Sequence, residues 1–414
     1  MNPLKENTKD INDNFIDIKN MYAKAYNKNK TSPYTKTRII LLNGTEFESN
    51  WFMHQFARNC DIDEIKQELA VVRKQEQQQQ KRIASLKPIN ESILETTIAY
   101  EQLAIDLTAT LAQNETDKNN IEALNFALLE DFDHLYRFAN LLAIDKGLDS
   151  ATLVGKYTEI MPGRPTISEH RYAKDDVKKP MNSKKSKLYS KLVANIITAA
   201  EQQTMNYYMN IAQWYKNDLG RKLYSEIGMI EEQHVSQYES LKDPTCSWLE
   251  QWVMHEYTEC YLYYSSYEEE TDNYIKNIWK EHYLMEVAHL KKAIELLEKY
   301  EKKNYKSVIG DGEFPTLLKH GTNKEYVRNV ISRTINLTGN GTSYIDINKL
   351  DNSANYFKYQ KIFIKNLEDV PSHLVINKAI QKLGKDYRYQ DSPHPIKELN
   401  SRTKDNVNVA RTKN

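Results

Sequence analysis

Three stretches of the chain place acidic residues and a histidine at one repeated spacing. Each stretch begins at a glutamate, and a second acid follows 30 positions later: 131 − 101 = 30, 231 − 201 = 30 and 286 − 256 = 30. A histidine follows after 33 positions: 134 − 101 = 33, 234 − 201 = 33 and 289 − 256 = 33. With 10 histidines and 57 acids in 414 residues, chance gives about a tenth of one such coincidence. The three matches therefore indicate an internal repeat. Its members are Glu101, Asp131 and His134; Glu201, Glu231 and His234; and Glu256, Glu286 and His289.

This spacing suits the binding of metal ions. An acid and a histidine three residues apart on a helix share one face, so both can reach one point in an interior. Turn residues lie near the middle of each stretch, in "NETDKNN", "KNDLG" and "EEETDN", which predicts three helical hairpins. In a hairpin, residues equally far from the turn lie at the same height. Two facing hairpins would then supply four carboxylates and two imidazoles, the ligand set of a di-iron or di-manganese carboxylate centre.

At these nine residues the chain resembles the ferritin-like superfamily, and "EEQH" at Glu231–His234 is similar to the rubrerythrin form of the motif. The resemblance covers roughly residues 90 to 303. It implies a ferritin-like helical bundle with two iron or manganese ions per site. Asp131 departs from the expected glutamate. The chain also lacks paired cysteines, so the rubredoxin module of full rubrerythrins is absent, and a third hairpin is one more than a single bundle needs.

Long stretches with apolar residues at helical spacing, and only 12 Gly and 11 Pro, predict an all-α protein. The expected organisation is a disordered N-terminal tail (1–45), a polar helical segment (46–88), a first hairpin (89–146), a long connection (147–187), the second and third hairpins as a four-helix bundle (188–303), a small C-terminal appendage (304–387) and a disordered tail (388–414). The glutamine run in "RKQEQQQQKR" is interpreted as a solvated helix face.

Two pairings of the hairpins are open. The link "SLKDPTCSW" between the second and third hairpins is short, which favours a bundle of residues 188–303. Alternatively, the first hairpin pairs with the second through the connection at 147–187, as in the crossover topology of ferritin-like folds. The first pairing is preferred as the main centre because both hairpins keep glutamate where the first has Asp131.

Other side chains near these motifs carry weaker signals. Glu259, one turn after Glu256, is either an extra ligand or an exposed acid. His255 and His282 are expected at the surface. The tyrosines around the motifs are expected to pack in the core, and one beside the metals could hydrogen-bond a ligand or quench a radical. They are Tyr207, Tyr208, Tyr261, Tyr263 and Tyr264.

Composition excludes several classes of partner. The 57 basic residues balance the 57 acidic ones, so no net charge favours nucleic acid or an acidic membrane. No signal sequence or run of about eighteen apolar residues is found, and a cytoplasmic protein is expected. Cys60, Cys246 and Cys260 are an odd number and far apart, which argues against a disulfide framework or a zinc ribbon.

Three functions fit these observations. The first is an oxidoreductase of rubrerythrin or manganese-catalase type, a peroxidase or catalase acting on peroxide or oxygen. The second is an iron-binding or storage protein that takes up ferrous iron without redox turnover. The third is a structural helical-repeat protein with buried polar networks. A separate electron-donor protein and a homo-oligomer are left open, and the ligands do not distinguish iron from manganese.

Overall fold

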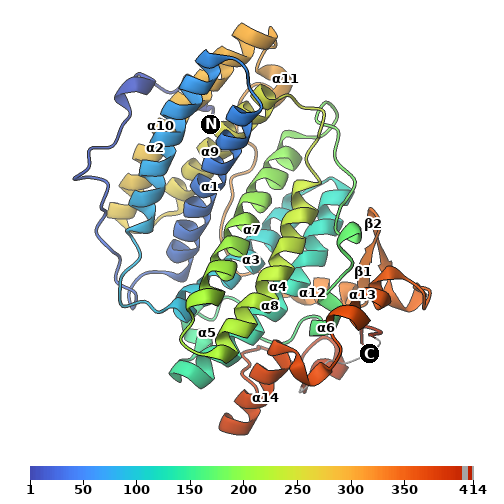
Figure 1. The fold of residues 1–414 in the computed structure, drawn as a ribbon. Helices are drawn as coiled ribbons and strands as arrows, with labels where there is room; N and C mark the ends of the chain where they lie inside the picture. Colours follow the sequence, from blue (N-terminus) through green and yellow to red (C-terminus); the bar gives the residue numbers. More distant parts are fainter. Residues whose placement is uncertain (403–408, 413–414) are drawn as a thin grey trace. The chain divides into compact units, whose positions relative to one another are not determined.

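The structure, a computed structural model, describes residues 1–402 and 409–412 (Figure 1). Within these residues the chain is mostly helical, with one two-stranded antiparallel sheet, so the predicted helical character is confirmed. None of the described helices has both the length and the apolar character needed to cross a bilayer. The α-helices are α1 (Pro33–Arg58), α2 (Asp63–Ala84), α3 (Ile93–Asn114), α4 (Lys118–Lys146), α5 (Ser150–Leu153), α6 (Thr166–Glu169), α7 (Leu188–Trp214), α8 (Asp218–Glu239), α9 (Trp248–Glu269), α10 (Asn273–Glu301), α11 (Lys306–Ile309), α12 (Lys324–Thr334), α13 (Asn355–Phe363) and α14 (Pro371–Leu383), and the strands are β1 (Leu337–Asn340) and β2 (Ser343–Asp346).

The eight long helices form two copies of one four-helix pattern. The first copy, residues 33–146, contains α1 to α4, and the second copy, residues 188–301, contains α7 to α10. Corresponding helices start at one constant offset: 188 − 33 = 155, 218 − 63 = 155, 248 − 93 = 155 and 273 − 118 = 155. Helices α2 and α8 each span 22 residues, α3 and α9 each span 22, and α4 and α10 each span 29. The chain therefore contains an internal duplication, in which residues 33–146 correspond to residues 188–301 without gaps.

The two copies also begin their helices with the same local chemistry. A capping box starts α3 at Ser92 and Glu95, and another starts α9 at Ser247 and Glu250. Aspartate caps α4 and α10, where its side chain accepts two backbone N–H groups of the first turn. These caps satisfy amide groups that a helix leaves without an internal partner. The same signals recur 155 residues apart, since 247 − 92 = 155.

The chain divides into two compact units that exchange hairpins between the copies. Unit 1 comprises residues 1–91, 180–203 and 242–319, and unit 2 comprises residues 92–179, 204–241 and 320–414. In unit 1, α1 and α2 of the first copy pack with α9 and α10 of the second (Figure 1). In unit 2, α3 and α4 of the first copy combine with α8 of the second, and α4 contacts α8 directly. The boundary between the units falls within α7, after Gln203.

This arrangement corrects the preferred pairing of the second and third hairpins into one bundle of residues 188–303. Helices α8 and α9 belong to different units although only eight residues separate them. The third hairpin instead packs with α1 and α2. These helices lie in the segments that were predicted as a disordered tail (1–45) and a polar helical segment (46–88). A short link fixes which helices follow one another, but the buried faces decide which of them pack together.

The N-terminal region is ordered, in contrast to the predicted tail at 1–45. Short 3-10 turns form at Pro3–Lys5 and Ile11–Asp13, and α1 begins at Pro33. The run at 39–42 is buried, which supplies the apolar surface that the composition of the segment did not suggest. The predicted polar segment at 46–88 is helical, but Gln75 and Gln79 of its glutamine run are buried rather than solvated.

Residues 147–179 of the long connection, and the C-terminal region from residue 320, belong to unit 2. Within 147–187, the side chains of Arg164, Glu169 and Arg171 are buried, and α12 and α14 of the appendage contact α4. In the segment predicted as a tail at 388–414, Tyr389 pairs with Ile160 through backbone hydrogen bonds and Arg402 is buried. The part of this prediction that concerns 403–408 and 413–414 lies outside the described residues.

A buried ion pair joins the two exchanged hairpins of unit 1. Glu270, at the turn after α9, accepts a hydrogen bond from Arg38 Nε of α1 at 3.0 Å, and both side chains are buried. Glu115 is its counterpart in the turn between α3 and α4, since 270 − 115 = 155, and it accepts hydrogen bonds from backbone amides and from Asn120. The two glutamates share one place in the repeat, but Arg38 corresponds to Val193 in the second copy, since 193 − 38 = 155.

We predict that Glu270→Gln lowers the free energy of unfolding by about 3 kcal/mol, because it leaves the guanidinium of Arg38 buried without its main counter-charge. Glu115→Gln is the matched control, and it should cost about 1 kcal/mol because it weakens hydrogen bonds without stranding an arginine. Calorimetric melting of both variants measures the difference. Equal losses would contradict the role given to the ion pair.

Candidate metal centres

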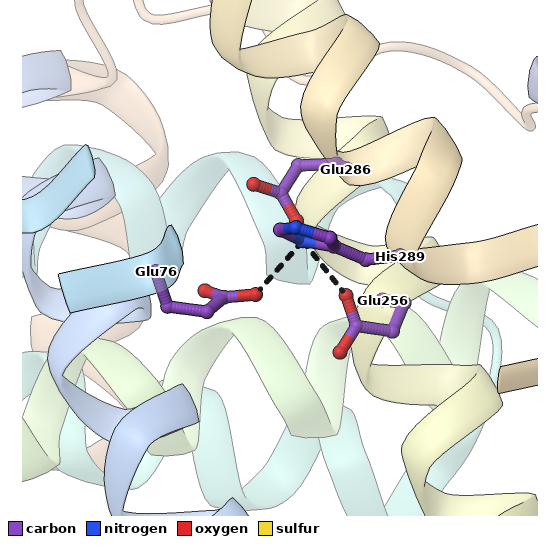
Figure 2. Close-up of side chains that lie close together, drawn as sticks. All are labelled: Glu76, Glu256, Glu286 and His289. Atoms are coloured by element: carbon purple, nitrogen blue, oxygen red, sulfur yellow. Dashed lines mark hydrogen bonds and ion pairs between the residues drawn. The ribbon is translucent and has the colours of Figure 1, made fainter. Parts of the chain in front are cut away.

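Six buried side chains from α1, α2, α9 and α10 converge in unit 1. This unit 1 cluster consists of Glu46, Glu76, Glu256, Glu259, Glu286 and His289. Their ligand atoms form two groups, each with all atoms within 4.8 Å of one another. We call the group of Glu76, Glu256, Glu286 and His289 the histidine position (Figure 2), and that of Glu46, Glu76 and Glu259 the carboxylate position. Because Glu76 belongs to both, it could bridge two cations.

The imidazole of His289 is oriented so that one nitrogen faces the acids. Its Nδ1 atom lies 3.1 Å from Glu286 Oε2, 3.1 Å from Glu76 Oε1 and 3.7 Å from Glu256 Oε2 (Figure 2). Its Nε2 atom lies 2.8 Å from Gln75 Oε1, and this amide oxygen can only accept a hydrogen bond. Nε2 therefore carries the proton of the neutral ring, which leaves the lone pair of Nδ1 directed at the cluster.

A second cluster lies in unit 2. This unit 2 cluster consists of Glu101 from α3, Asp131 and His134 from α4, and Glu231 and His234 from α8, all of them buried. Glu231 is shared between the two imidazoles: its Oε1 lies 2.9 Å from His134 Nδ1 and its Oε2 lies 3.0 Å from His234 Nδ1. Asp131 Oδ1 lies 3.2 Å from the same nitrogen of His234. Each imidazole thus presents Nδ1 to the acids, as His289 does in unit 1.

The outer nitrogens of these two histidines face a different set of acids. His234 Nε2 lies 2.8 Å from Glu130 Oε2, and His134 Nε2 lies 3.6 Å from Glu169 Oε2. Glu130 is paired with two buried arginines, one of them Arg164 at 2.6 Å, and Glu169 is paired with Arg137 at 2.5 Å. The protein therefore balances the outer acids with guanidinium groups, whereas the charged partners of the inner acids are imidazoles.

Several carboxylate oxygens within the clusters accept no hydrogen bond although they are buried. They are both oxygens of Glu259, and one oxygen each of Glu46, Glu256 and Glu101. A buried polar atom without a partner costs free energy, and a buried anion costs more. Divalent cations between these oxygens would remove that cost. The donor set of carboxylates and Nδ1 atoms fits iron or manganese.

Burial and mutual repulsion set the protonation of the acids. Burial raises the pKa of Glu259 well above its ordinary value, and the charges of Glu76 and Glu286 raise it further. Burial likewise raises the pKa of Glu46 and of Glu101. Burial alone would also raise the pKa of Glu231, but the two imidazoles beside it lower that pKa to about 2. Without metal, the clusters must therefore hold protons that cations would displace.

Nine of the ten predicted ligands lie in the two clusters. The unit 2 cluster contains Glu101, Asp131, His134, Glu231 and His234, and the unit 1 cluster contains Glu256, Glu259, Glu286 and His289. Glu201 is 1% exposed on α7 and belongs to unit 1, two residues before the boundary. Glu201 corresponds to Glu46 in the duplication, since 201 − 46 = 155. Its role as a ligand stays a prediction.

Glu46 and Glu76 were not predicted as ligands, although they follow the same spacing. The second acid again comes 30 positions after the first, since 76 − 46 = 30, but the residue 33 positions after Glu46 is Gln79. The hairpin of α1 and α2 therefore does not match the pattern of two acids and a histidine. The signal that identifies this hairpin is the spacing of its two acids together with the constant offset of 155 residues between the copies.

The expectation that His255 and His282 lie at the surface was wrong. His255 is 5% exposed, with Nε2 bonded to Glu48 and Nδ1 3.6 Å from Glu259 Oε2. His282 is fully buried, and its Nδ1 lies 3.1 Å from the hydroxyl oxygen of Tyr263. Both histidines face the interior of unit 1 because their helices, α9 and α10, bury residues on more than one side.

No family model, curated protein or solved structure matches the chain.

In the metal-free protein, we predict that the free energy of unfolding falls as the pH rises from about 5 to 8. The native state holds protons on Glu46, Glu101 and Glu259 that the unfolded chain releases above the ordinary pKa of 4.5, so a higher pH favours unfolding. His134 and His289 act in the same direction. Neighbouring acids outweigh burial and raise the pKa of both imidazoles, so their contribution is lost as the pH rises through the folded values.

Melting temperatures at pH 5 and pH 8, with chelator or with saturating Mn²⁺, test this expectation. Bound metal replaces the protons, so the melting temperature of the metal-loaded protein should not fall between pH 5 and pH 8. The same pH dependence in both samples would contradict it.

Proposed function

We propose that each unit is a ferritin-like helical bundle with a di-iron or di-manganese centre, and that the chain is an oxidoreductase acting on peroxide or oxygen. The observation that carries the proposal is the pairing of the buried acids. Outer acids such as Glu130 and Glu169 meet arginines, whereas Glu259 accepts no hydrogen bond. A purely structural polar network would give such an acid a donor. The pairing therefore favours metal binding over the structural helical-repeat alternative.

The arrangement of ligands along the helices supports the same conclusion. Each hairpin supplies an acid from its first helix and an acid with a residue three positions later from its second helix, the pattern of di-metal carboxylate bundles. Glu76 in unit 1 and Glu231 in unit 2 each belong to two groups of ligand atoms. An acid in this position can bridge two cations, so we expect two ions in each unit and four per chain.

Iron or manganese ions held in the clusters would exchange electrons with peroxide or oxygen, chemistry that the side chains of the protein lack. The surrounding residues orient and protect the ligands. Gln75 and Glu130 fix the rings of His289 and His234 through their outer nitrogens. A buried tyrosine serves each cluster: the hydroxyl of Tyr263 donates to Glu46, and that of Tyr208 donates to Glu101 at 2.5 Å. These phenols can hold a proton beside a ligand or quench a radical.

A small pocket in unit 1 offers a route for a small substrate. It has a volume of about 70 Å³ and is lined by Phe52, Cys246, Met254 and His255, among others. His255 connects it to the cluster, because its Nδ1 lies 3.6 Å from Glu259 Oε2. A pocket of this size suits peroxide or oxygen better than a larger organic substrate.

The source of electrons distinguishes the reactions within this proposal. A peroxidase cycle needs electrons, and the chain has no C-x-x-C pair for a rubredoxin centre, so it would need a separate electron-donor protein. Disproportionation at manganese needs no donor, because peroxide is both oxidant and reductant. Storage of ferrous iron, the remaining alternative, requires an assembly of chains that encloses a cavity.

We predict that Glu231→Ala removes the two ions of unit 2, so that metal content falls from about four to about two per chain, because this acid is shared by both imidazoles. Glu232→Ala is the matched control, since Glu232 is exposed on the same helix and should leave four ions bound. Elemental analysis after metal loading measures the content. Chelation should also lower the melting temperature of the wild type more than that of Glu231→Ala. Equal metal content in the two variants would contradict the assignment.

The reaction is tested with the full chain loaded separately with iron and manganese. Peroxide is added with and without a reduced electron carrier, and its loss is followed together with particle size. We expect accelerated loss of peroxide in at least one condition, by about a hundredfold or more over free metal. No acceleration, together with a closed shell that takes up many irons per chain, would favour storage instead.

A further inference from the structure

The duplication allows the two clusters to be compared residue by residue. Subtracting or adding 155 relates Glu256, Glu286 and His289 in unit 1 to Glu101, Asp131 and His134 in unit 2, and relates Glu76 to Glu231. At these four places an acid corresponds to an acid and a histidine to a histidine, with Asp131 in place of Glu286 as the one change of acid. The histidine position of unit 1 therefore has a counterpart in unit 2 that also contains an imidazole.

Two other places differ between the units. Gln79 of unit 1 stands where unit 2 has His234, since 234 − 79 = 155. Glu259 of unit 1 stands where unit 2 has Ala104, since 259 − 104 = 155. At these two places unit 1 thus has one imidazole fewer and one carboxylate more than unit 2. Glu259 belongs to the carboxylate position, which contains no nitrogen ligand. The place of Gln79 faces an acid of that position, because His234 Nδ1 lies 3.0 Å from Glu231, the counterpart of Glu76.

The side chains at the carboxylate position are placed to receive a cation. Glu259 is fully buried, and neither of its oxygens accepts a hydrogen bond. Glu46 is also fully buried; one of its oxygens accepts the hydroxyl of Tyr263, and the other accepts no hydrogen bond. Gln79 donates its amide N–H to Glu286, so this group cannot act as a nitrogen ligand. Only oxygen atoms are offered at this position.

We propose that the two units differ in metal preference, with Mn²⁺ favoured at the carboxylate position of unit 1 and Fe²⁺ at the two positions of unit 2, one beside His134 and one beside His234. This inference rests on the proposed function. Oxygen ligands suit Mn²⁺, whereas an imidazole strengthens the binding of Fe²⁺ relative to Mn²⁺. Unit 1 would then hold a mixed pair, with Mn²⁺ at the carboxylate position and Fe²⁺ at the histidine position beside His289.

The test compares the positions within one molecule. The full chain is loaded without oxygen at equal concentrations of Mn²⁺ and Fe²⁺ and crystallised, and anomalous scattering at the two absorption edges gives the metal at each position. We expect the ratio of Mn²⁺ to Fe²⁺ at the carboxylate position to exceed that at either position of unit 2 by about fivefold or more. Because this comparison uses the wild type, it does not depend on whether a variant folds.

A substitution tests the cause of the preference. Gln79→His restores the imidazole that the duplication predicts, and should lower the ratio of Mn²⁺ to Fe²⁺ at the carboxylate position towards that of unit 2. Gln77→His is the matched control, because Gln77 is exposed on the same helix and the new imidazole lies outside the cluster. It should leave the ratio unchanged.

The outcomes separate this inference from the proposed function. Metal at all positions with the same ratio throughout would overturn the inference and leave the proposed function standing. Metal at no position would overturn both. An unchanged ratio in Gln79→His, with metal bound and the wild-type ratios unequal, would overturn the assignment of the preference to the missing imidazole.

Discussion

The burial of more acids than bases within each helical unit is the constraint on which the rest of the structure depends. The unit 1 cluster brings five carboxylates and one imidazole together with almost no exposure to solvent. Such a cluster repels itself unless protons or cations neutralise it, and burial makes the repulsion stronger. The protein supplies arginines to the acids one layer further out, as at Glu130, and leaves imidazoles for the acids inside. The helices therefore enclose a negative charge, most of which two divalent cations would offset.

Because the two copies exchange hairpins, the enclosed charge of unit 1 depends on both copies of the repeat. The clustered side chains of unit 1 come from α1 and α2 in the first copy and from α9 and α10 in the second. Neither copy contains that cluster on its own, because Glu46 lies in the first copy and His289 in the second. Metal binding in unit 1 would consequently stabilise contacts between segments far apart in the sequence, and would link folding to metal supply.

The sequence predicted which side chains cluster better than it predicted which helices pack together. The spacing of 30 and 33 residues depends on helix geometry within one hairpin, so it identified nine residues that the structure places in the two clusters. It missed Glu46 and Glu76 because Gln79 interrupts the pattern. It also misplaced the pairing of hairpins, since that choice depends on matching buried faces across more than a hundred residues. The burial of His255, Gln75 and Arg164 was not predicted because polar composition alone resembles that of a solvated surface.

We infer that the two clusters hold metal ions in the living cell. Elemental analysis of the full chain purified from its native source is the most direct test. The account predicts about four ions per chain, as iron, manganese or both, held through gel filtration without added metal. Protein that is folded yet contains no iron or manganese, and that takes up neither when supplied with them, would contradict the account.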